Sequence, residues 1–318
     1  MKDYLQTVTG PVAREDMGLT LPHEHLFNDL SSVVDAPCYP FSQQLVDKKV
    51  TAEIQWALKH DPYCCADNMD RKPIEDVIFE INNFISLGGR TIVDATGSES
   101  IGRDAQALRE VALKTGLNIV ASSGPYLEKF ESQRIHKTVD ELATTIDKEL
   151  NQGIGDTDIR AGMIGEIGVS PTFTEAEHNS LRAASLAQIN NPHVAMNIHM
   201  PGWLRRGDEV LDIVLGEMGV SPNKVSLAHS DPSGKDVAYQ RKMLDKGEAI
   251  EKPLSSLPYS LSRHILEHLR KLTSHEPVPG IMGKSGPVNP HSVMRCFRGR
   301  SPRSVMFTPA PGKCSASV

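Results

Sequence analysis

Leu19-Thr-Leu-Pro-His-Glu-His-Leu-Phe27 ends an apolar run with two histidines, His23 and His25. In a β-strand, residues i and i+2 point to the same face of the sheet, so the two imidazoles would lie side by side. Adjacent imidazoles can hold one metal ion. Because His-x-His also occurs by chance, this interpretation needs support from the rest of the chain.

The chain after Pro73 alternates between helical and strand patterns. Apolar residues at helical spacing predict helices over residues 73–87, 103–115, 139–151, 174–189, 207–218 and 234–246. Short apolar runs predict strands over residues 91–96, 118–123, 161–167, 194–199, 225–229 and 248–250. With the His-x-His strand these make seven β units, which is typical of a parallel sheet, either closed as a barrel or open and doubly wound.

The first quarter of the chain has a less regular pattern. Residues 3–13 predict a short β segment with a turn at Gly10-Pro11. Residues 28–72 predict a long loop excursion, with one helix at about residues 48–60. We expect this excursion to lie outside the repeating strand and helix units.

Polar residues at the ends of predicted strands favour the barrel. His199 and His229 each end a strand, and Glu166 lies near the end of an otherwise apolar one. Either histidine alone would be typical of a core position, but a buried carboxylate must be paired or bound to a metal. An open dinucleotide-binding sheet would carry a GxGxxG turn, which is absent. We therefore predict an α/β fold, a (β/α)8 TIM barrel with a metal centre at its mouth.

Composition excludes several classes of protein. No run of eighteen apolar residues exists and no apolar leader follows Met1, so we expect neither a membrane span nor a secretory signal. Five cysteines, two of them adjacent (Cys64 and Cys65), form no disulfide framework or CxxC pattern, which favours a cytoplasmic location. A net charge of −6 argues against a nucleic-acid partner.

Three strings in the chain resemble the phosphotriesterase family of the amidohydrolase superfamily. They are Gly-Leu-Thr-Leu-Pro-His-Glu-His-Leu from residue 18, Ala-Gly-Met-Ile-Gly-Glu-Ile-Gly from residue 161 and Leu-Ala-His-Ser-Asp from residue 227. Members of the family bridge two metal ions with either a carboxylated Lys or a Glu. Glu166 is similar to the bridging residue of the phosphotriesterase-related branch, which uses Glu.

This resemblance implies a binuclear centre, most simply with a pair of Zn²⁺ ions. His23 and His25 would bind the more buried ion, His199 and His229 the more exposed one, and Glu166 would bridge both. A hydroxide shared by the ions would attack a phosphoester, carboxylic ester, lactone or amide of a small molecule. The resembled family commonly forms homodimers, so a homodimer is one possibility, and the sequence leaves the oligomeric state open.

Two further residues have roles that the sequence leaves open. Asp231, two residues after His229, would orient a metal ligand or accept a proton in catalysis, or it would only cap the helix that follows Pro232. Tyr126 would line the substrate pocket, or it would pack over the barrel rim.

The chain changes character after residue 250. Residues 1–249 carry a net charge of −13, whereas residues 250–318 carry +7, and residues 251–318 contain nine prolines. An apolar helical face at 259–271 is the only regular pattern there, and no eighth strand is predicted. We therefore divide the chain into a hydrolase barrel (1–250) and a basic Pro/Ser-rich tail (251–318), expected to be disordered.

The tail also affects the predicted centre. The family pattern requires an Asp at the end of strand 8, but the last Asp of this chain is Asp245. One hypothesis is a shifted reading frame or misjoined exon near codon 251, and the alternative is a divergent C-terminus. If the Asp is missing, activity of this exact chain should be weak or absent.

Two other functions remain open. A TatD-type metal-dependent deoxyribonuclease shares the His-x-His, the Gly-Glu-Ile-Gly strand and two later histidines, but its His-x-His normally follows Asp-x nearer the N-terminus. A non-catalytic metal-binding protein is the third hypothesis, and the missing Asp is the sequence feature that favours it.

Overall fold

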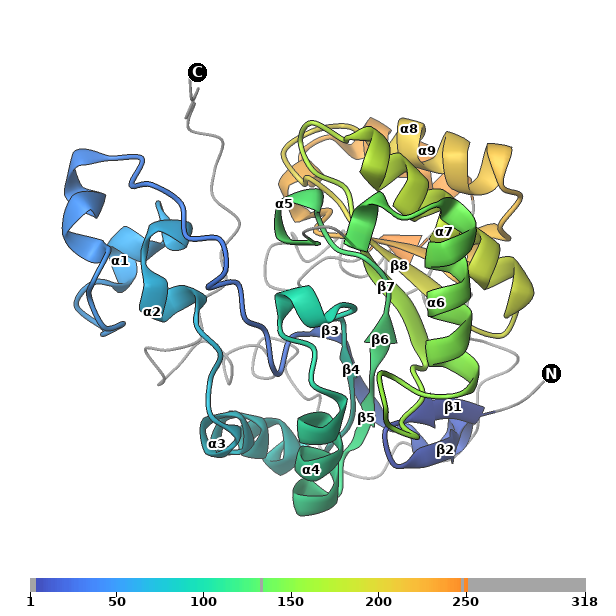
Figure 1. Cartoon of the computed structure of the whole chain (residues 1–318), viewed down its shortest axis with the longest axis horizontal. Helices are drawn as coiled ribbons and strands as arrows, with labels where there is room; N and C mark the ends of the chain where they lie inside the picture. Colours follow the sequence, from blue (N-terminus) through green and yellow to red (C-terminus); the bar gives the residue numbers. More distant parts are fainter. Residues whose placement is uncertain (1–3, 132–133, 247–248, 251–318) are drawn as a thin grey trace.

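Parallel strands follow one another in chain order (Figure 1). The structure, a computed structural model, describes residues 4–131, 134–246 and 249–250. One sheet has the order β3 (Leu19–Glu24), β4 (Gly89–Asp94), β5 (Asn118–Val120). The other has the order β6 (Ser122–Ser123), β7 (Met163–Gly168), β8 (Ala195–His199), β9 (Val225–Ala228), β10 (Ala249–Ile250).

The two sheets are parts of one curved surface. Only Ala121 separates β5 from β6, so one chain segment pairs with β4 on one side and with β7 on the other. A doubly wound sheet reverses its strand order at a switch point, whereas the described strands run in sequence throughout. The predicted α/β fold is confirmed, with the strand order of a barrel. The eighth strand, the tail and the domain boundary at residue 250 concern residues outside the described part.

Helices alternate with these strands, as predicted. The longer ones are α3 (Ile74–Ser86), α4 (Ala105–Thr115), α6 (Val139–Asn151), α7 (Glu175–Asn190), α8 (Gly207–Leu211), which continues into the π-helical η6 (Asp212–Glu217), and α9 (Val237–Asp245). Short ones are α1 (Gln55–Leu58), α2 (Ala66–Met69) and α5 (Glu128–Glu131). The remaining turns are η1 (Arg14–Asp16), η2 (Pro40–Leu45), η3 (Pro62–Cys64), η4 (Glu99–Ile101), η5 (Arg134–His136), η7 (Pro222–Lys224) and η8 (Asp231–Ser233). None of the helices in the described ranges is long and apolar enough to cross a membrane.

Local sequence signals explain where the helices begin and end. Thr138 caps α6 by accepting from the backbone N–H of Glu141, whose carboxylate accepts in return from the N–H of Thr138. Thr174 and Glu177 make the same capping box at α7. Helix α4 ends at Gly116, whose backbone φ of 73° is rarely adopted by residues other than glycine. These signals fix helix ends to within one or two residues of the prediction.

A single large core lies between the strands and the helices. Ile92, Ile119, Ile164 and Ile198 on successive strands are fully buried. They belong to one apolar cluster with the inner faces of the helices, among them Leu108 of α4. The hairpin of β1 (Tyr4–Thr7) and β2 (Gly10–Ala13) confirms the β segment predicted at 3–13, and the Val8 N–H donates to the Ile119 carbonyl.

The segment 28–72 forms a small separate lobe, whose α1 and α2 lie to the left of the strands in Figure 1. The helix predicted at about 48–60 is wrong, since only Gln55–Leu58 is α-helical there. Val50 is instead buried in a small core with Leu45 and Leu58, and its N–H donates to the Asp67 carboxylate at 2.8 Å. Tertiary burial thus overrides the helical pattern.

A buried ion pair connects the loop between η4 and α4 to helix α6. The Arg103 guanidinium donates to both carboxylate oxygens of Glu149, at 2.6 and 2.8 Å, and to the carbonyls of Gly97 and Ser122. The Arg103 side chain is fully buried and the Glu149 side chain is 7% exposed. Removal of one partner would leave an uncompensated charge in the interior.

We expect Arg103→Met to lower the free energy of unfolding by about 3–5 kcal/mol, because the buried Glu149 carboxylate would lose its opposite charge and keep only weaker neutral donors such as the Ser123 hydroxyl. The double variant Arg103→Met/Glu149→Leu should recover most of this loss. Urea unfolding followed by circular dichroism measures both. Lys114→Met, which removes an exposed pair with Glu110, is the control and should leave the free energy of unfolding nearly unchanged. A loss below about 1 kcal/mol for Arg103→Met would contradict the argument.

Candidate metal centre

Glu166 lies at the centre of a ring of four histidines. Its residue is 1% exposed. Imidazole nitrogens approach its carboxylate at 2.8 Å (His229), 3.1 Å (His199), 3.2 Å (His23) and 3.6 Å (His25). The structure therefore brings together all five residues that the sequence suggested as metal ligands.

These side chains come from the C-terminal ends of four strands. His23 lies in β3 and His25 directly after it, Glu166 lies in β7, His199 ends β8 and His229 follows β9. His229 has a φ of 55°, an uncommon conformation for a residue with a side chain, which costs about 1 kcal/mol or more. Such strain persists where the surrounding structure holds it, and here it turns the imidazole toward Glu166.

The electrostatics of the cluster suit metal binding. Burial lowers the pKa of His25 to about 3 and also lowers the pKa of His199, so both are neutral at pH 7 and keep a lone pair. Burial opposes ionisation of Glu166, but the surrounding histidines, His199 first, lower its pKa well below the usual value. The cluster thus presents at least two neutral imidazoles, those of His25 and His199, beside one carboxylate anion.

The donor set fits a pair of divalent cations. The residues form two groups of three, and within each group the donor atoms lie within 4.8 Å of one another. One group is His23, His25 and Glu166, and the other is Glu166, His199 and His229. Imidazole and carboxylate donors suit Zn²⁺ and related metals. Neutral imidazoles do not balance the buried charge of Glu166, whereas a cation would.

A sequence profile of the phosphotriesterase family matches residues 3–254. The chain belongs to the phosphotriesterase family. A phosphotriesterase-related protein of Nematostella vectensis is 33% identical over 230 residues, which cover 71% of this chain and 65% of that protein. An N-acetyltaurine hydrolase of Xenopus tropicalis is 35% identical over 235 residues, which cover 71% of this chain and 64% of that protein. The match thus spans slightly less than two thirds of these relatives.

A solved structure has the same architecture. The crystal structure of a resiniferatoxin-binding protein from Rhodobacter sphaeroides superposes with a TM-score of 0.74 and 36% sequence identity. The superposition covers 78% of this chain and 69% of that one. The phosphotriesterase-family fold therefore extends over most of the described residues.

Thr96 and Asp94 orient one of the family's histidines. Thr96 Oγ1 lies 2.9 Å from Nδ1 of His25, whose Nε2 faces Glu166. The Asp94 carboxylate accepts from the backbone N–H groups of Leu26 and Thr96, at 2.7 and 3.0 Å, and from the Thr96 hydroxyl. Neither residue was found from the sequence, because the contacts of Thr96 with His25 and of Asp94 with Leu26 cross between neighbouring strands.

Tyr126 lies beside the centre; from the sequence, it would either line the substrate pocket or pack over the barrel rim. Its hydroxyl is 3.3 Å from Nδ1 of His199, and the two rings meet edge to face. Burial, then the charge of Glu166, raises its pKa well above 10, so the hydroxyl keeps its proton. The buried Glu131 holds the loop, because its carboxylate accepts from the Tyr126 N–H at 2.6 Å and the Ser98 hydroxyl at 2.9 Å. Sequence reasoning missed Glu131.

Asp231 is the remaining site residue that the sequence suggested. It begins η8, just after His229. Its predicted contacts concern a side chain outside the described part of the structure, so its role remains a prediction.

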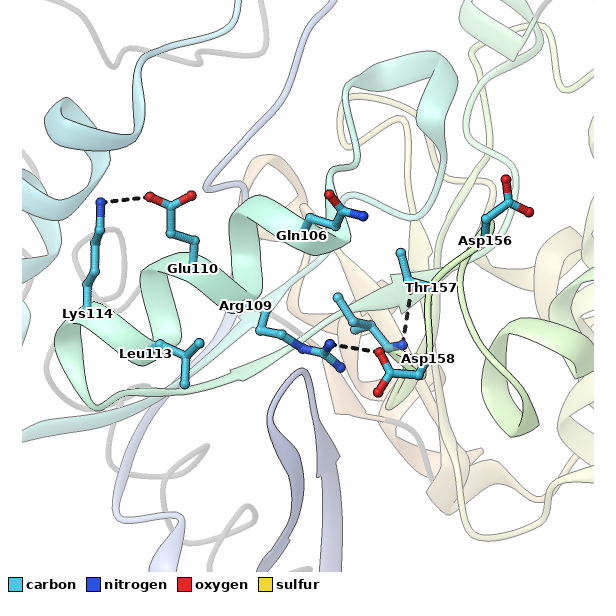
Figure 2. A pocket seen from close by; sticks show the side chains of 9 residues that line it. Gln106, Arg109, Glu110, Leu113, Lys114, Asp156, Thr157 and Asp158 are labelled. Atoms are coloured by element: carbon cyan, nitrogen blue, oxygen red, sulfur yellow. Dashed lines mark hydrogen bonds and ion pairs between the residues drawn. The ribbon is translucent and has the colours of Figure 1, made fainter.

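A surface hollow of about 630 Å³ lies away from the metal centre (Figure 2). Helix α4 and the loop before β7 line it, with Leu113 at one side. Four of its charged groups form two ion pairs, Arg109 with Asp158 at 2.8 Å and Lys114 with Glu110 at 2.7 Å. The loop leads into the N-terminal end of β7, whereas the metal centre lies at the C-terminal ends of the strands. The hollow is therefore not part of the centre.

We expect Thr96→Val to weaken metal binding about 10-fold or more, because His25 would lose the partner that fixes its ring and tautomer. Competition with a graded series of chelators, followed by elemental analysis, measures the affinity. Thr91→Val makes the same change earlier in β4, where the hydroxyl donates to the Met17 carbonyl, and should leave metal affinity unchanged. Equal affinities in the two variants would show that Thr96 does not orient His25.

Proposed function

We propose that this chain is a metal-dependent hydrolase of a small-molecule substrate. The observation that carries the proposal is the burial of Glu166 among four histidines at the strand ends. Divalent ions bound there would lower the pKa of water and polarise a carbonyl or phosphoryl oxygen. Zn²⁺ is the proposed metal, on the basis of the donor types.

The chain's own residues would hold and shield the reacting groups. The four imidazoles are fixed at the ends of buried strands, which limits the movement of their nitrogens. Glu166 supplies the negative charge that keeps cations in place. The protonated Tyr126 hydroxyl, next to His199, can donate a hydrogen bond to a substrate oxygen.

An amide of the N-acetyltaurine kind is the substrate class that we propose first. The support is the 35% identity with a relative of that activity. In this reaction the water oxygen would bond to the acyl carbon, the C–N bond would break, and the amine nitrogen would take a proton. In an ester or lactone the C–O bond would break instead, and in a phosphoester the water oxygen would bond to phosphorus and a P–O bond would break; in each case the leaving oxygen would take a proton.

We expect purified protein to contain about two Zn²⁺ per chain. Glu166→Ala should bind much less of either ion, because the Glu166 carboxylate belongs to both donor groups. Elemental analysis measures the metal, and release of taurine from N-acetyltaurine measures turnover, which should be weak or absent if no other residue replaces the strand-8 Asp. Glu110→Ala changes an exposed carboxylate on α4 and should keep both metal and activity.

Other results would favour other functions. Metal binding with cleavage of plasmid DNA, and no hydrolysis of amides, esters, lactones or phosphoesters, would support the deoxyribonuclease hypothesis. Stoichiometric metal without hydrolysis of any of these would support a non-catalytic metal-binding protein. Metal content unchanged in Glu166→Ala would contradict the proposed centre itself.

A further inference from the structure

A small apolar cluster connects the lobe of residues 28–72 to the loop that carries Tyr126. Four buried side chains form this bridging cluster, namely Leu30, Met69, Ile101 and Phe130. Partly buried side chains pack against it, namely Val33, Tyr63, Tyr126 and Leu127. Tyr63 from the lobe and Tyr126 from the metal centre therefore share one packing unit.

Polar contacts hold the inner edge of the lobe in place. The Lys129 ammonium of α5 donates to both carboxylate oxygens of Asp35, at 2.6 and 2.7 Å. The same ammonium lies 5.4 Å from the centre of the Tyr63 ring and 5.4 Å from that of Phe130. The Asp35 N–H donates to the Tyr63 carbonyl at 2.9 Å. Tyr63 is thus fixed through both its backbone and its ring.

The Tyr63 side chain also lies within the electrostatic reach of the metal centre. Burial, then the negative charges of Asp35 and Glu166, raises its pKa. The Tyr126 hydroxyl is 3.3 Å from Nδ1 of His199, and Tyr63 packs against the same cluster as Tyr126, so the two tyrosines lie on the same side of the centre.

We propose that Tyr63 is a specificity-determining residue, which forms with Tyr126 the wall that limits the size of the group bound beside His199. The inference rests on the proposed hydrolase function. A ring held by a cation on its face and by an apolar cluster cannot swing aside at low cost, so it selects ligands by size. The lobe then contributes to substrate choice through one side chain.

The test measures ligand binding, which needs no turnover. Acetate, butyrate and hexanoate are titrated by calorimetry into zinc-loaded wild-type protein, Tyr63→Ala and Tyr63→Phe. We expect wild-type protein to prefer acetate, and Tyr63→Ala to raise the affinity for hexanoate relative to acetate about 10-fold. Tyr63→Phe keeps the ring and should keep the wild-type ratio.

Tyr39→Ala is the matched control, because Tyr39 belongs to the same lobe but stacks on Phe41 at 5.2 Å, outside the bridging cluster. It should keep the wild-type ratio. Tyr63→Leu replaces Tyr63→Ala if the latter does not fold, with the same expectation in the same direction. Metal content is measured in each variant and should stay at the wild-type value.

An unchanged acetate-to-hexanoate ratio in Tyr63→Ala or Tyr63→Leu with full metal content would overturn the inference, and so would wild-type protein that binds none of the three carboxylates. Size-selective binding that changes in these variants supports it, even if no substrate is hydrolysed. In that last case the proposed hydrolase function fails while the inference about Tyr63 stands.

Discussion

The burial of one negative charge, on Glu166, is the constraint on which the arrangement of the centre depends. A carboxylate in the interior is costly unless opposite charge or hydrogen bonds compensate it. Histidines from three other strand ends converge on it, and no lysine or arginine contacts it among the described residues. Since burial keeps His25 and His199 neutral, the compensation that best fits this site is a metal cation. The positions of the strand ends and the strained backbone of His229 bring the imidazoles to this carboxylate.

Close approach of strands makes the convergence possible. Gly165, next to Glu166, has a φ of 117°, and a Cβ atom there would collide with the carbonyl oxygen of Asn197 on β8. Gly97, after β4, is equally crowded, because its Cβ would meet the backbone carbonyls of Gly165 and Gly124. Glycine is needed at both places for the strand ends to pack together. The two glycines therefore belong to the centre as much as the residues with functional side chains.

The strand-end residues could be predicted because each carries its signal locally. A polar side chain at the end of an apolar run is visible in the sequence, and so is a capping box such as Thr138 with Glu141. Thr96, Glu131 and Tyr63 carry no such signal, since their contacts with His25, Tyr126 and the bridging cluster depend on how separate loops meet. The helix predicted at about 48–60 was wrong for the same reason, because the burial of Val50 is set by the lobe and not by its neighbours in sequence.

The centre itself shows how strongly the strands curve. Between β3 and β9 lie β4, the continuous β5–β6 segment, β7 and β8. In a flat sheet β3 and β9 would therefore lie about 24 Å apart, at the usual strand spacing of about 4.8 Å. The rings of His23, on β3, and His229, after β9, have centroids only 5.1 Å apart. Only a sheet curled almost into a closed ring brings them together. A metal pair held by both histidine groups would tie the first strand to the sixth, and binding to the folded state alone would stabilise that curvature. The curvature of the sheet therefore brings the candidate metal ligands together, and metal bound by them would stabilise the same curvature.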